Sequence, residues 1–455
     1  MALKSINPAT GELLETFTEQ TEEQAAEAAA ACHEAFAAWS RSGFARRAGL
    51  LKRAAGVLRA EKNPLARMMS EEMGKPVLQA ISEVEKCALV CEYYAEGGEA
   101  MLAPERIATE AAASYVRFDP LGVVLAVMPW NFPFWQVFRF AAPALMAGNA
   151  CLLKHAANVT RCAARIEETF RRAGFPRHVF TALRVGSGQV AALIAHPQVR
   201  AVTLTGSDLA GRQVAAAAGR HLKKVVLELG GSDPFIVLQD APLARCVAAA
   251  VGSRMINNGQ SCIAAKRFIV VKDVFNRFQK AFTGAVAELK TGNPLDESND
   301  LGPLARADLV DELERQVRDS VRRGARVLTG GKRLGKGPGF YFQPTVLAGV
   351  VPGMPAYDEE IFGPVAALIN AADEEDALRI ANDTPFGLGA SIWTGDRARA
   401  ERLAARIEAG TVYINGMVKS DPRLPFGGIK RSGFGRELSG YGIKEFVNIK
   451  TVVIL

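Results

Sequence analysis

The sequence predicts an α/β protein built on mostly parallel sheets. Short apolar runs rich in β-branched residues, such as 199–205 and 224–228, recur along the chain. They alternate with helical segments of roughly 10–15 residues, a pattern typical of βαβ units with parallel strands. The 455 residues are enough for two or three domains of about 150 residues each. With 49% hydrophobic and 23% charged residues, the composition argues against a disordered chain.

The N-terminal hundred residues are predicted to be largely helical. Residues 21–24, Thr-Glu-Glu-Gln, fit a capping box, in which two side chains satisfy backbone N–H groups at a helix start. An alanine-rich helix is expected from there to about Trp39. Further helical patterns cover residues 46–61, 64–73 and 77–100.

The middle of the chain is predicted to alternate between strands and helices. Strands are expected within 108–133 and over 148–154, 199–205, 223–231 and 235–240, with helices over 160–173 and 209–219. Asp240 is expected to cap the next helix, which has Pro242 in its first turn. That helix is expected to run to about Asn257, where Asn-Asn-Gly ends it.

The C-terminal part continues the same alternation. Strands are expected over 267–271, 325–331 and 410–415, and a helix over 307–323. A glycine-rich segment covers 425–435, and an alternating strand covers 447–455. Since no internal repeat or low-complexity linker is evident, we expect compact and closely joined domains.

Composition narrows the classes of function. The net charge is +7, but basic residues are interleaved with acids, which favours a solvated surface over a nucleic-acid face. Seven cysteines without a CxxC pair argue against a disulfide framework or a metal site and for a reducing compartment. The first residues lack the apolar core of a signal peptide, and the most apolar region is broken by prolines, asparagines and Arg139. We therefore expect a cytoplasmic protein without a membrane segment.

Two residues could carry reactive chemistry. Cys262 lies in a loop after a predicted helix end and before Lys266 and Arg267, a setting in which a thiol can be partly exposed and its pKa lowered. The alternative is an inert packed thiol. Glu228 ends a buried strand, where a carboxylate is costly without a partner or a role. It is either a general base with a raised pKa or half of a buried ion pair.

Three further segments could bind a ligand. Trp130 and Asn131 follow an apolar strand in a proline-bracketed turn, and Lys154 closes another strand, where its side chain can reach a crevice ligand. Gly206 and Ser207 join a strand to a helix, and such a turn presents backbone N–H groups to a phosphate. Each segment also has a purely structural interpretation, as a turn, a solvated strand end or a plain connection.

Together, these segments resemble the aldehyde dehydrogenase family. The resemblance covers nearly the whole chain and is carried by PWNFP, ELGG, GQSC, EEIFGP (359–364) and PFGGIKRSG (425–433), in the family's order. Within the family, KHAANV, GQSCIAAKRF and SDPRLPFGG (420–428) are most similar to bacterial NAD(P)-dependent succinate-semialdehyde dehydrogenases. The alternatives are the same chemistry on glutaric semialdehyde or an aliphatic aldehyde, and, less favoured, acyl transfer to coenzyme A.

The resemblance implies a mechanism and a cofactor site. Cys262 is expected to attack the aldehyde, with Asn131 and the Cys262 N–H as oxyanion donors and Glu228 as the base for hydrolysis. The expected cofactor residues are Trp130, Lys154, Ala157, Gly206, Ser207, Glu360 and Phe362. NADP or NAD is expected as the cofactor. Many NAD-specific members have a glutamate where Ala157 stands, so acceptance of NADP is predicted, although Asp208 adds a negative charge nearby.

The resemblance also implies a substrate site and an assembly. Arg139 is expected to bind a distal carboxylate, since a guanidinium suits that group. Ile256 stands where some relatives have a second arginine, and Arg254, Ser420 or Arg423 are expected to substitute. The implied fold has a Rossmann-like cofactor domain (1–106 and 122–228), an α/β catalytic domain (229–432) and an oligomerisation β-ribbon (107–121 and 433–455). The last strand is expected to join a neighbouring subunit of a homodimer or homotetramer.

Overall fold

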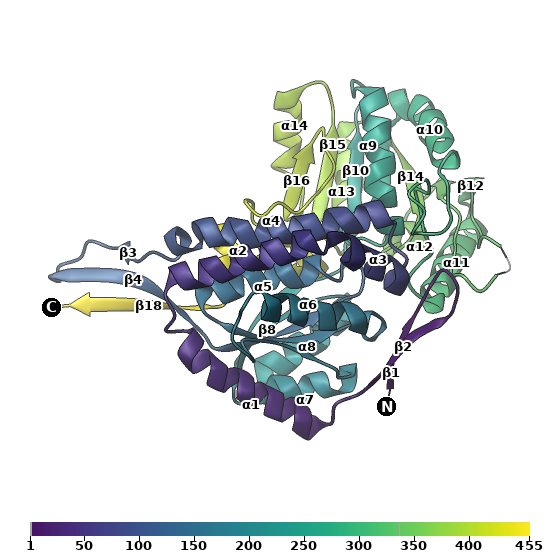
Figure 1. The fold of residues 1–455 in the computed structure, drawn as a ribbon. Coiled ribbons are helices and arrows are strands. Elements are labelled where there is room, and N and C mark those ends of the chain that lie inside the picture. Colours follow the sequence, from purple (N-terminus) through teal and green to yellow (C-terminus); the bar gives the residue numbers. More distant parts are fainter. Residues whose placement is uncertain (1, 336) are drawn as a thin grey trace.

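The computed structural model describes residues 2–335 and 337–455, which form two α/β units and a protruding ribbon (Figure 1). The first unit has a six-stranded sheet in the order β17-β9-β8-β5-β6-β7. All its neighbouring strands run parallel except β17, which is antiparallel to β9. Its strands are β5 (Val123–Met128), β6 (Ala150–His155), β7 (Phe180–Leu183), β8 (Val199–Thr205), β9 (Lys224–Glu228) and β17 (Gly433–Phe434).

The helices of this unit cover both faces of its sheet. Alternate residues of β5 divide between two cores, because successive side chains of a strand point to opposite faces. One face carries α1 (Glu22–Trp39), α7 (Val190–Ala195) and α8 (Asp208–Arg220). The other carries α2 (Phe44–Ala60), α3 (Lys62–Met73), α4 (Val77–Met101), α5 (Trp135–Ala147), α6 (Thr160–Arg172) and α15 (Ser439–Ile443).

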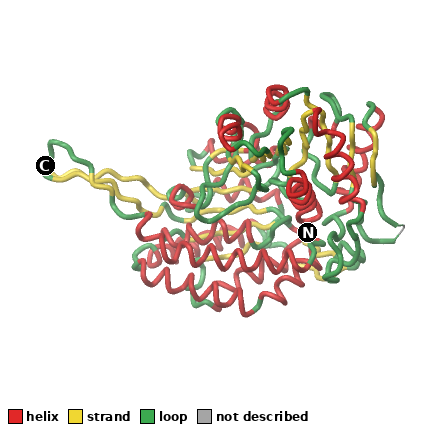
Figure 2. The backbone as a smooth tube through the Cα atoms, turned by 90° about the horizontal axis from the view of Figure 1, so that it is seen from above, coloured by secondary structure: helices red, strands yellow, loops and turns green. Residues whose placement is uncertain are grey.

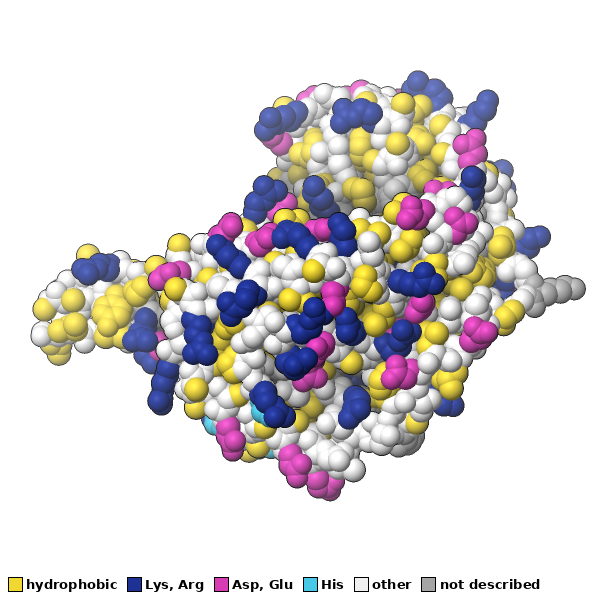
Figure 3. Space-filling view, viewed as in Figure 1, with side chains coloured by type: hydrophobic (Ala, Val, Ile, Leu, Met, Phe, Trp, Pro, Cys, Tyr) yellow, Lys and Arg dark blue, Asp and Glu magenta, His cyan; other side chains and the backbone are white. Residues whose placement is uncertain are grey.

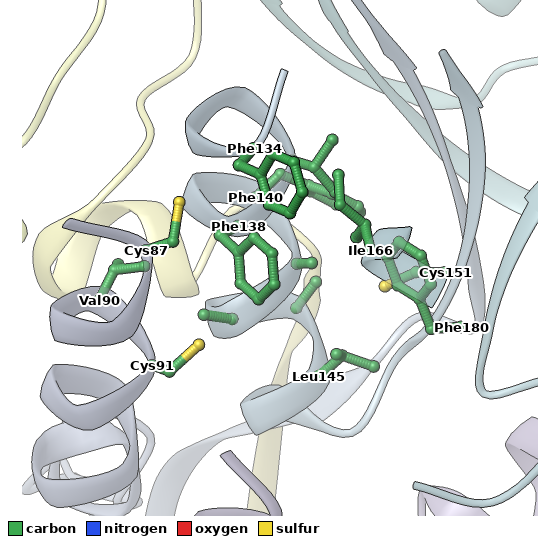
Figure 4. Packing of buried hydrophobic residues seen from close by; sticks show 14 of the residues in the cluster. Cys87, Val90, Cys91, Phe134, Phe138, Phe140, Leu145, Cys151, Ile166 and Phe180 are labelled. Atoms are coloured by element: carbon green, nitrogen blue, oxygen red, sulfur yellow. The ribbon is translucent and has the colours of Figure 1, made fainter. Parts of the chain in front are cut away.

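Helices α4 and α5 pack together and carry residues of the site described below. Cys87 and Cys91 of α4 lie near the phenylalanines of α5, and all of these side chains are buried (Figure 4). The start of α5 is tied to α4 by polar contacts as well. The N–H groups of Phe134 and Trp135 both donate to Glu83 at 2.9 Å. Glu83 in turn forms a buried ion pair with Lys75.

The second unit has a seven-stranded sheet in the order β12-β13-β14-β11-β10-β15-β16, parallel except at β12. Its strands are β10 (Asp233–Val237), β11 (Ala265–Val271), β12 (Arg326–Thr329), β13 (Thr345–Ala348), β14 (Val365–Ala371), β15 (Gly389–Trp393) and β16 (Thr411–Ile414). Its helices are α9 (Leu243–Met255), α10 (Lys272–Ala287), α11 (Ala307–Arg322), α12 (Pro355–Asp358), α13 (Glu374–Asn382) and α14 (Arg397–Ala404). The predicted mostly parallel α/β fold is therefore confirmed.

A three-stranded ribbon extends from the body of the molecule (Figures 1 and 2). It consists of β18 (Val447–Ile454), β4 (Ala113–Pro120) and β3 (Glu105–Arg106), in the order β18-β4-β3. Two boundaries differ from the sequence prediction, because β3 lies before the predicted start at 107 and the C-terminal part starts later than 433. Gly433–Phe434 belongs to the six-stranded sheet, so the C-terminal part of the ribbon is β18 and does not begin at 433. Strand β18 pairs with β4 of its own chain over eight residues, and its other edge stays open within the described chain.

Of two helix caps predicted from the sequence, one is present in the structure and the other is not. Thr21 forms the predicted capping box with Gln24 at the start of α1. Asp240, in contrast, does not cap α9, which begins after Pro242. The Asp240 carboxylate instead accepts hydrogen bonds from the Thr394 hydroxyl at 2.7 Å and the Gly395 N–H at 3.1 Å. A contact distant in sequence thus replaced the local one.

The chain begins with the hairpin β1 (Ala2–Ile6) and β2 (Leu13–Thr18).

The described helices contain no segment long and apolar enough to cross a membrane. On the face shown in Figure 3, lysine and arginine side chains are mixed with acidic ones, while hydrophobic side chains gather on the protruding ribbon.

Candidate active site

Cys262 is partly exposed, whereas the other six cysteines are buried. It lies between the short 3₁₀ turn Ile256–Gly259 and β11. Within that turn, Asn257 and Asn258 adopt left-handed backbone conformations with φ of 53° and 59°. Asparagine tolerates this region better than most residues, so the Asn-Asn-Gly sequence permits the sharp reversal that precedes the thiol.

The charge beside Cys262 differs from the sequence prediction. Lys266 is fully buried, and its ammonium donates to the carbonyls of Ser261 at 2.9 Å and Cys262 at 2.8 Å. Arg267 lies elsewhere, bonded to the carbonyls of Ser232, Ile380 and Ala381. Burial raises the pKa of the Cys262 thiol to about 12, and the charges of Arg139 and Lys266 offset this only in part. The prediction of a lowered thiol pKa is wrong, because desolvation outweighs the nearby cations.

Asn131 connects the turn after β5 to the cysteine loop. Its side-chain N–H donates to the carbonyl of Gln260 at 3.1 Å, and its backbone carbonyl accepts from the Asn257 amide at 2.6 Å. An amide nitrogen has two hydrogens, so a second N–H of Asn131 stays available. Within residues 2–335 and 337–455, no acceptor takes the backbone N–H of Cys262. The structure thus places the Asn131 amide against the cysteine loop, and both this amide and the Cys262 backbone retain an uncommitted N–H.

Glu228 ends β9 in a fully enclosed position. Neither of its carboxylate oxygens has a hydrogen-bond partner in the described part of the chain. Burial, followed by the charge of Glu437, raises the pKa of Glu228 well above its ordinary value, and Arg139 opposes the shift. The site is tight, because a Cβ added to Gly427 would lie 2.7 Å from Glu228 Oε1. A buried carboxyl whose pKa is raised in this way is suited to acid–base chemistry.

The predicted cofactor residues gather at the carboxyl edge of the six-stranded sheet. Lys154 is the penultimate residue of β6, and Ala157 follows at the start of a 3₁₀ turn. Gly206 and Ser207 follow β8, and the Ser207 hydroxyl caps α8 by accepting from the Ala210 N–H at 3.3 Å. Since the strands are parallel, their ends meet at one edge, where nucleotides bind in open α/β sheets.

The second unit contributes two of the predicted cofactor residues. Phe362 packs edge-to-face against Trp130, with ring centroids 5.8 Å apart. The guanidinium of Arg306 lies over the same indole, 5.5 Å from its centroid. Glu360 accepts from the Gly231 N–H at 3.0 Å and lies 3.4 Å from the Lys266 ammonium. Residues far apart in the sequence therefore meet between the two sheets.

A cavity of about 310 Å³ opens beside Cys262. Its walls combine apolar side chains with a few polar ones. The residues that line it are Gln79, Ser82, Glu83, Lys86, Phe132, Trp135, Gln136, Arg139, Ile256, Ser261, Cys262, Ile263, Met417, Val418, Lys419, Ser420 and Phe426. Two of the predicted substrate residues, Arg139 and Ser420, are therefore in place. Glu228 is not among these described lining residues and lies close to the Arg139–Glu437 ion pair instead.

The two other predicted substrate residues lie outside this lining. Arg254 is completely buried, and its guanidinium donates to the carbonyls of Gly259 and Ala265. It therefore supports the cysteine loop from within the fold. Arg423 is exposed and pairs with Asp421 at 2.7 Å. Neither arginine replaces the one missing at Ile256. The guanidinium of Arg254 is bonded to backbone carbonyls, and that of Arg423 is paired with Asp421.

Sequence reasoning missed Lys86 and Trp135, which both line the cavity. Lys86 stands in the middle of α4, far from every motif of the family. A signal was available, because Glu83 interrupts the apolar stripe of this helix and Lys86 follows it one turn further along. A charge in such a stripe indicates a partner or a cavity.

We compared the sequence and the fold with those of known proteins. The family model described as the aldehyde dehydrogenase family matches residues 1–452. This chain belongs to the aldehyde dehydrogenase family. The resemblance found in its motifs is thereby confirmed, and the fold is the aldehyde dehydrogenase fold.

Similar members of the family have names that concern one substrate. A protein of Synechocystis sp., named a probable succinate-semialdehyde dehydrogenase [NADP(+)], is 51% identical over the full length of both chains. The Mycobacterium tuberculosis protein named succinate-semialdehyde dehydrogenase [NADP(+)] 1 is 50% identical, also over the full length of both. The crystal structure of succinic semialdehyde dehydrogenase from Streptococcus pyogenes in complex with NADP⁺ superposes with a TM-score of 0.97, at 37% identity and full coverage of both chains.

Proposed function

We propose that this protein oxidises succinic semialdehyde to succinate and uses NADP⁺ as the hydride acceptor. The observation that carries the proposal is the cavity, in which the one partly exposed thiol shares its walls with cationic side chains. A small cavity of this kind suits a four-carbon aldehyde with a carboxylate at its far end. The names and the NADP⁺ complex of the similar family members support the same substrate and cofactor.

Cys262 is proposed as the nucleophile. Its sulfur forms a bond to the aldehyde carbon, and the thiol proton leaves to a base or to water. The Asn131 amide and the Cys262 backbone N–H then hold the new oxyanion, each contributing about 3 kcal/mol of transition-state stabilisation. The bond between Asn131 and Gln260 fixes the amide before substrate arrives, so little reorganisation accompanies the reaction.

Loss of hydride from the carbon of the thiohemiacetal would leave a thioester on Cys262, and Glu228 is proposed as the base that hydrolyses it. It removes a proton from water, the oxygen bonds to the acyl carbon, and the carbon–sulfur bond breaks to return the Cys262 thiolate. Enclosure raises the pKa of Glu228 above its ordinary value, which makes the ionised carboxylate a stronger base and favours this role. A base at this position favours release of a free acid over transfer to coenzyme A.

The residues at the sheet edge fit a nicotinamide dinucleotide. When bound, NADP⁺ supplies the hydride acceptor. We propose that Lys154 and Glu360 bind its riboses, that Trp130 and Phe362 line the nicotinamide pocket, and that the turn at Gly206–Ser207 lies under the pyrophosphate. The pairing of Asp208 with Arg212 at 3.1 Å reduces the repulsion that Asp208 would exert on a 2′-phosphate. Ala157 adds no charge there, so NADP⁺ is favoured.

The ribbon is proposed as the surface on which copies of the chain assemble in the cytoplasm. Strand β18 leaves one edge open, and Ile449, Val453, Ile454 and Leu455 expose hydrophobic side chains on it. Edge strands of this kind pair with another chain unless they are covered. We therefore propose a homodimer or homotetramer, and place the cofactor domain at 1–106 and 122–228, with the catalytic domain beginning at 229.

A kinetic grid tests the proposed function. Succinic semialdehyde, glutaric semialdehyde and hexanal are each assayed with NADP⁺ and with NAD⁺. We expect succinic semialdehyde with NADP⁺ to give the highest kcat/KM, by about tenfold or more over hexanal, because only the acid substrates satisfy a cation in the cavity. A preference for hexanal would contradict the substrate, and stimulation by coenzyme A would contradict hydrolysis.

A further inference from the structure

Lys86 occupies an unusual place in the substrate cavity. It projects from the middle of α4 and is half-buried. Its ammonium lies 4.1 Å from the ring centroid of Trp135, over the indole face. It also donates a hydrogen bond to the Ser420 hydroxyl at 2.7 Å. Two contacts from different parts of the chain therefore fix the position of this charge.

The hydrogen bonds around Ser420 set the direction of its hydroxyl. The Ser420 oxygen accepts from Lys86 and also from the Trp135 indole N–H at 3.0 Å. A serine hydroxyl has two acceptor lone pairs and one hydrogen to donate. With both lone pairs occupied, the hydrogen is left for a third group. An ammonium has three donors, and the described residues take one of those of Lys86.

The charges around the cavity distinguish Lys86 from the other cations. Arg139 is completely buried and forms an ion pair with Glu437. Lys419 is exposed to solvent. Lys86 has no carboxylate within ion-pair distance among the residues that the structure describes. Burial lowers its pKa to about 8, and the charge of Arg139 adds to the shift, while the more distant carboxylates of Glu83 and Asp421 oppose it. A partly desolvated cation without a directly paired carboxylate is suited to an anionic ligand.

We propose that Lys86, together with the Ser420 hydroxyl that it and Trp135 orient, binds the carboxylate of the aldehyde substrate. This inference rests on the proposed oxidation of a carboxylated aldehyde. It adds a specificity contact from α4 to the one expected of Arg139, whose guanidinium also pairs with Glu437 close to Glu228. The lysine thus supplies the second positive contact that the sequence lacks at Ile256.

Steady-state kinetics of Lys86→Met tests the assignment. The two substrates are succinic semialdehyde and butanal, which share a four-carbon chain but differ in the carboxylate, at saturating NADP⁺. We expect KM for succinic semialdehyde to rise by about 10- to 100-fold, the value of a charge-assisted hydrogen bond, with kcat and the butanal constants within about twofold of wild type. The inhibition constant of succinate, measured against succinic semialdehyde, is expected to rise in parallel.

Three further variants sharpen the result. Lys86→Arg keeps the charge and is expected to restore most of the affinity for the acid substrate. Lys419→Met removes an exposed positive charge from the same wall and is expected to change KM by less than about threefold, because solvent screens it. In the double variant Lys86→Met with Ser420→Ala, the second change is expected to add little, because the lysine and the serine act as one unit.

The outcomes separate the inference from the proposed function. If wild type shows no preference for succinic semialdehyde over butanal, the proposed function fails. If wild type shows that preference and Lys86→Met retains it, the assignment to Lys86 is overturned. Equal losses with both substrates in Lys86→Met and in Lys86→Arg would show a structural role only, and would also overturn it.

Discussion

Glu228→Gln separates the two halves of the proposed reaction. The substitution keeps the shape of the side chain and removes its ability to accept a proton. The carboxylate oxygens of Glu228 have no hydrogen-bond partner among the described residues, so the change breaks no direct bond in the structure. Thiohemiacetal formation and hydride transfer depend on Cys262 and Asn131, and they are expected to continue.

The size of the effect follows from the role of a general base. Positioned bases contribute about 10²- to 10⁴-fold to a proton-transfer step, so thioester hydrolysis is expected to slow by that factor. Hydrolysis then limits turnover. Rapid mixing of Glu228→Gln with NADP⁺ and succinic semialdehyde is therefore expected to release about one reduced cofactor per active site in a burst, followed by a slow steady state. Absorbance of the reduced nicotinamide measures both phases.

Two results would refute this reasoning. Steady-state turnover equal to wild type would show that Glu228 is not the base for hydrolysis. A complete loss of the burst, in a protein whose thermal unfolding midpoint is unchanged, would place Glu228 before hydride transfer. Isotopic substitution at the aldehyde hydrogen gives a further check, because a burst limited by hydride transfer slows with deuterium and the slow phase does not.

Three other perturbations follow from the structure. Lys75→Met leaves the buried Glu83 carboxylate without its ion-pair partner. We therefore expect a loss of about 3–5 kcal/mol in the free energy of unfolding, measured by denaturant titration. An unchanged unfolding midpoint would show that the ion pair does not stabilise the fold. Ala157→Glu is expected to raise KM for NADP⁺ by about tenfold or more while sparing NAD⁺, because like charges repel; equal effects on both cofactors would remove position 157 from the ribose site. The pKa of Glu228 is raised from 4.5, so the fraction that can act as a base grows with pH and kcat should rise through the raised pKa. Over the same interval the folded state binds a proton that the unfolded chain has released, so stability should fall as pH rises, and Glu228→Gln should flatten both profiles.

The sequence predicted the parts of the site that depend on local order along the chain. Lys154, Ser207 and Glu228 all stand at or just after strand ends, and parallel strands bring those ends to one edge. The loop position of Cys262 could be predicted because Asn257 and Asn258 fit a sharp reversal before a strand. These features follow from periodicity and turn preferences.

Other features depend on contacts between distant segments, which no local pattern encodes. Arg139 pairs with Glu437, and Lys86 with Ser420, each across about 300 residues of chain. Arg254 was predicted to bind substrate because the sequence does not show that its guanidinium donates to carbonyls of the cysteine loop. The raised pKa of Cys262 was equally hidden, because the sequence shows the neighbouring cations and not the burial that outweighs them.

The most direct test of the account is the mass of the trapped intermediate. Glu228→Gln is mixed with succinic semialdehyde and NADP⁺, quenched in acid during the slow phase, digested and examined by mass spectrometry. We expect that the peptide containing Cys262 gains the mass of one succinyl group, and that the peptides of the six buried cysteines do not. A succinyl group on another cysteine, or none on Cys262 after a full burst of reduced cofactor, would contradict it.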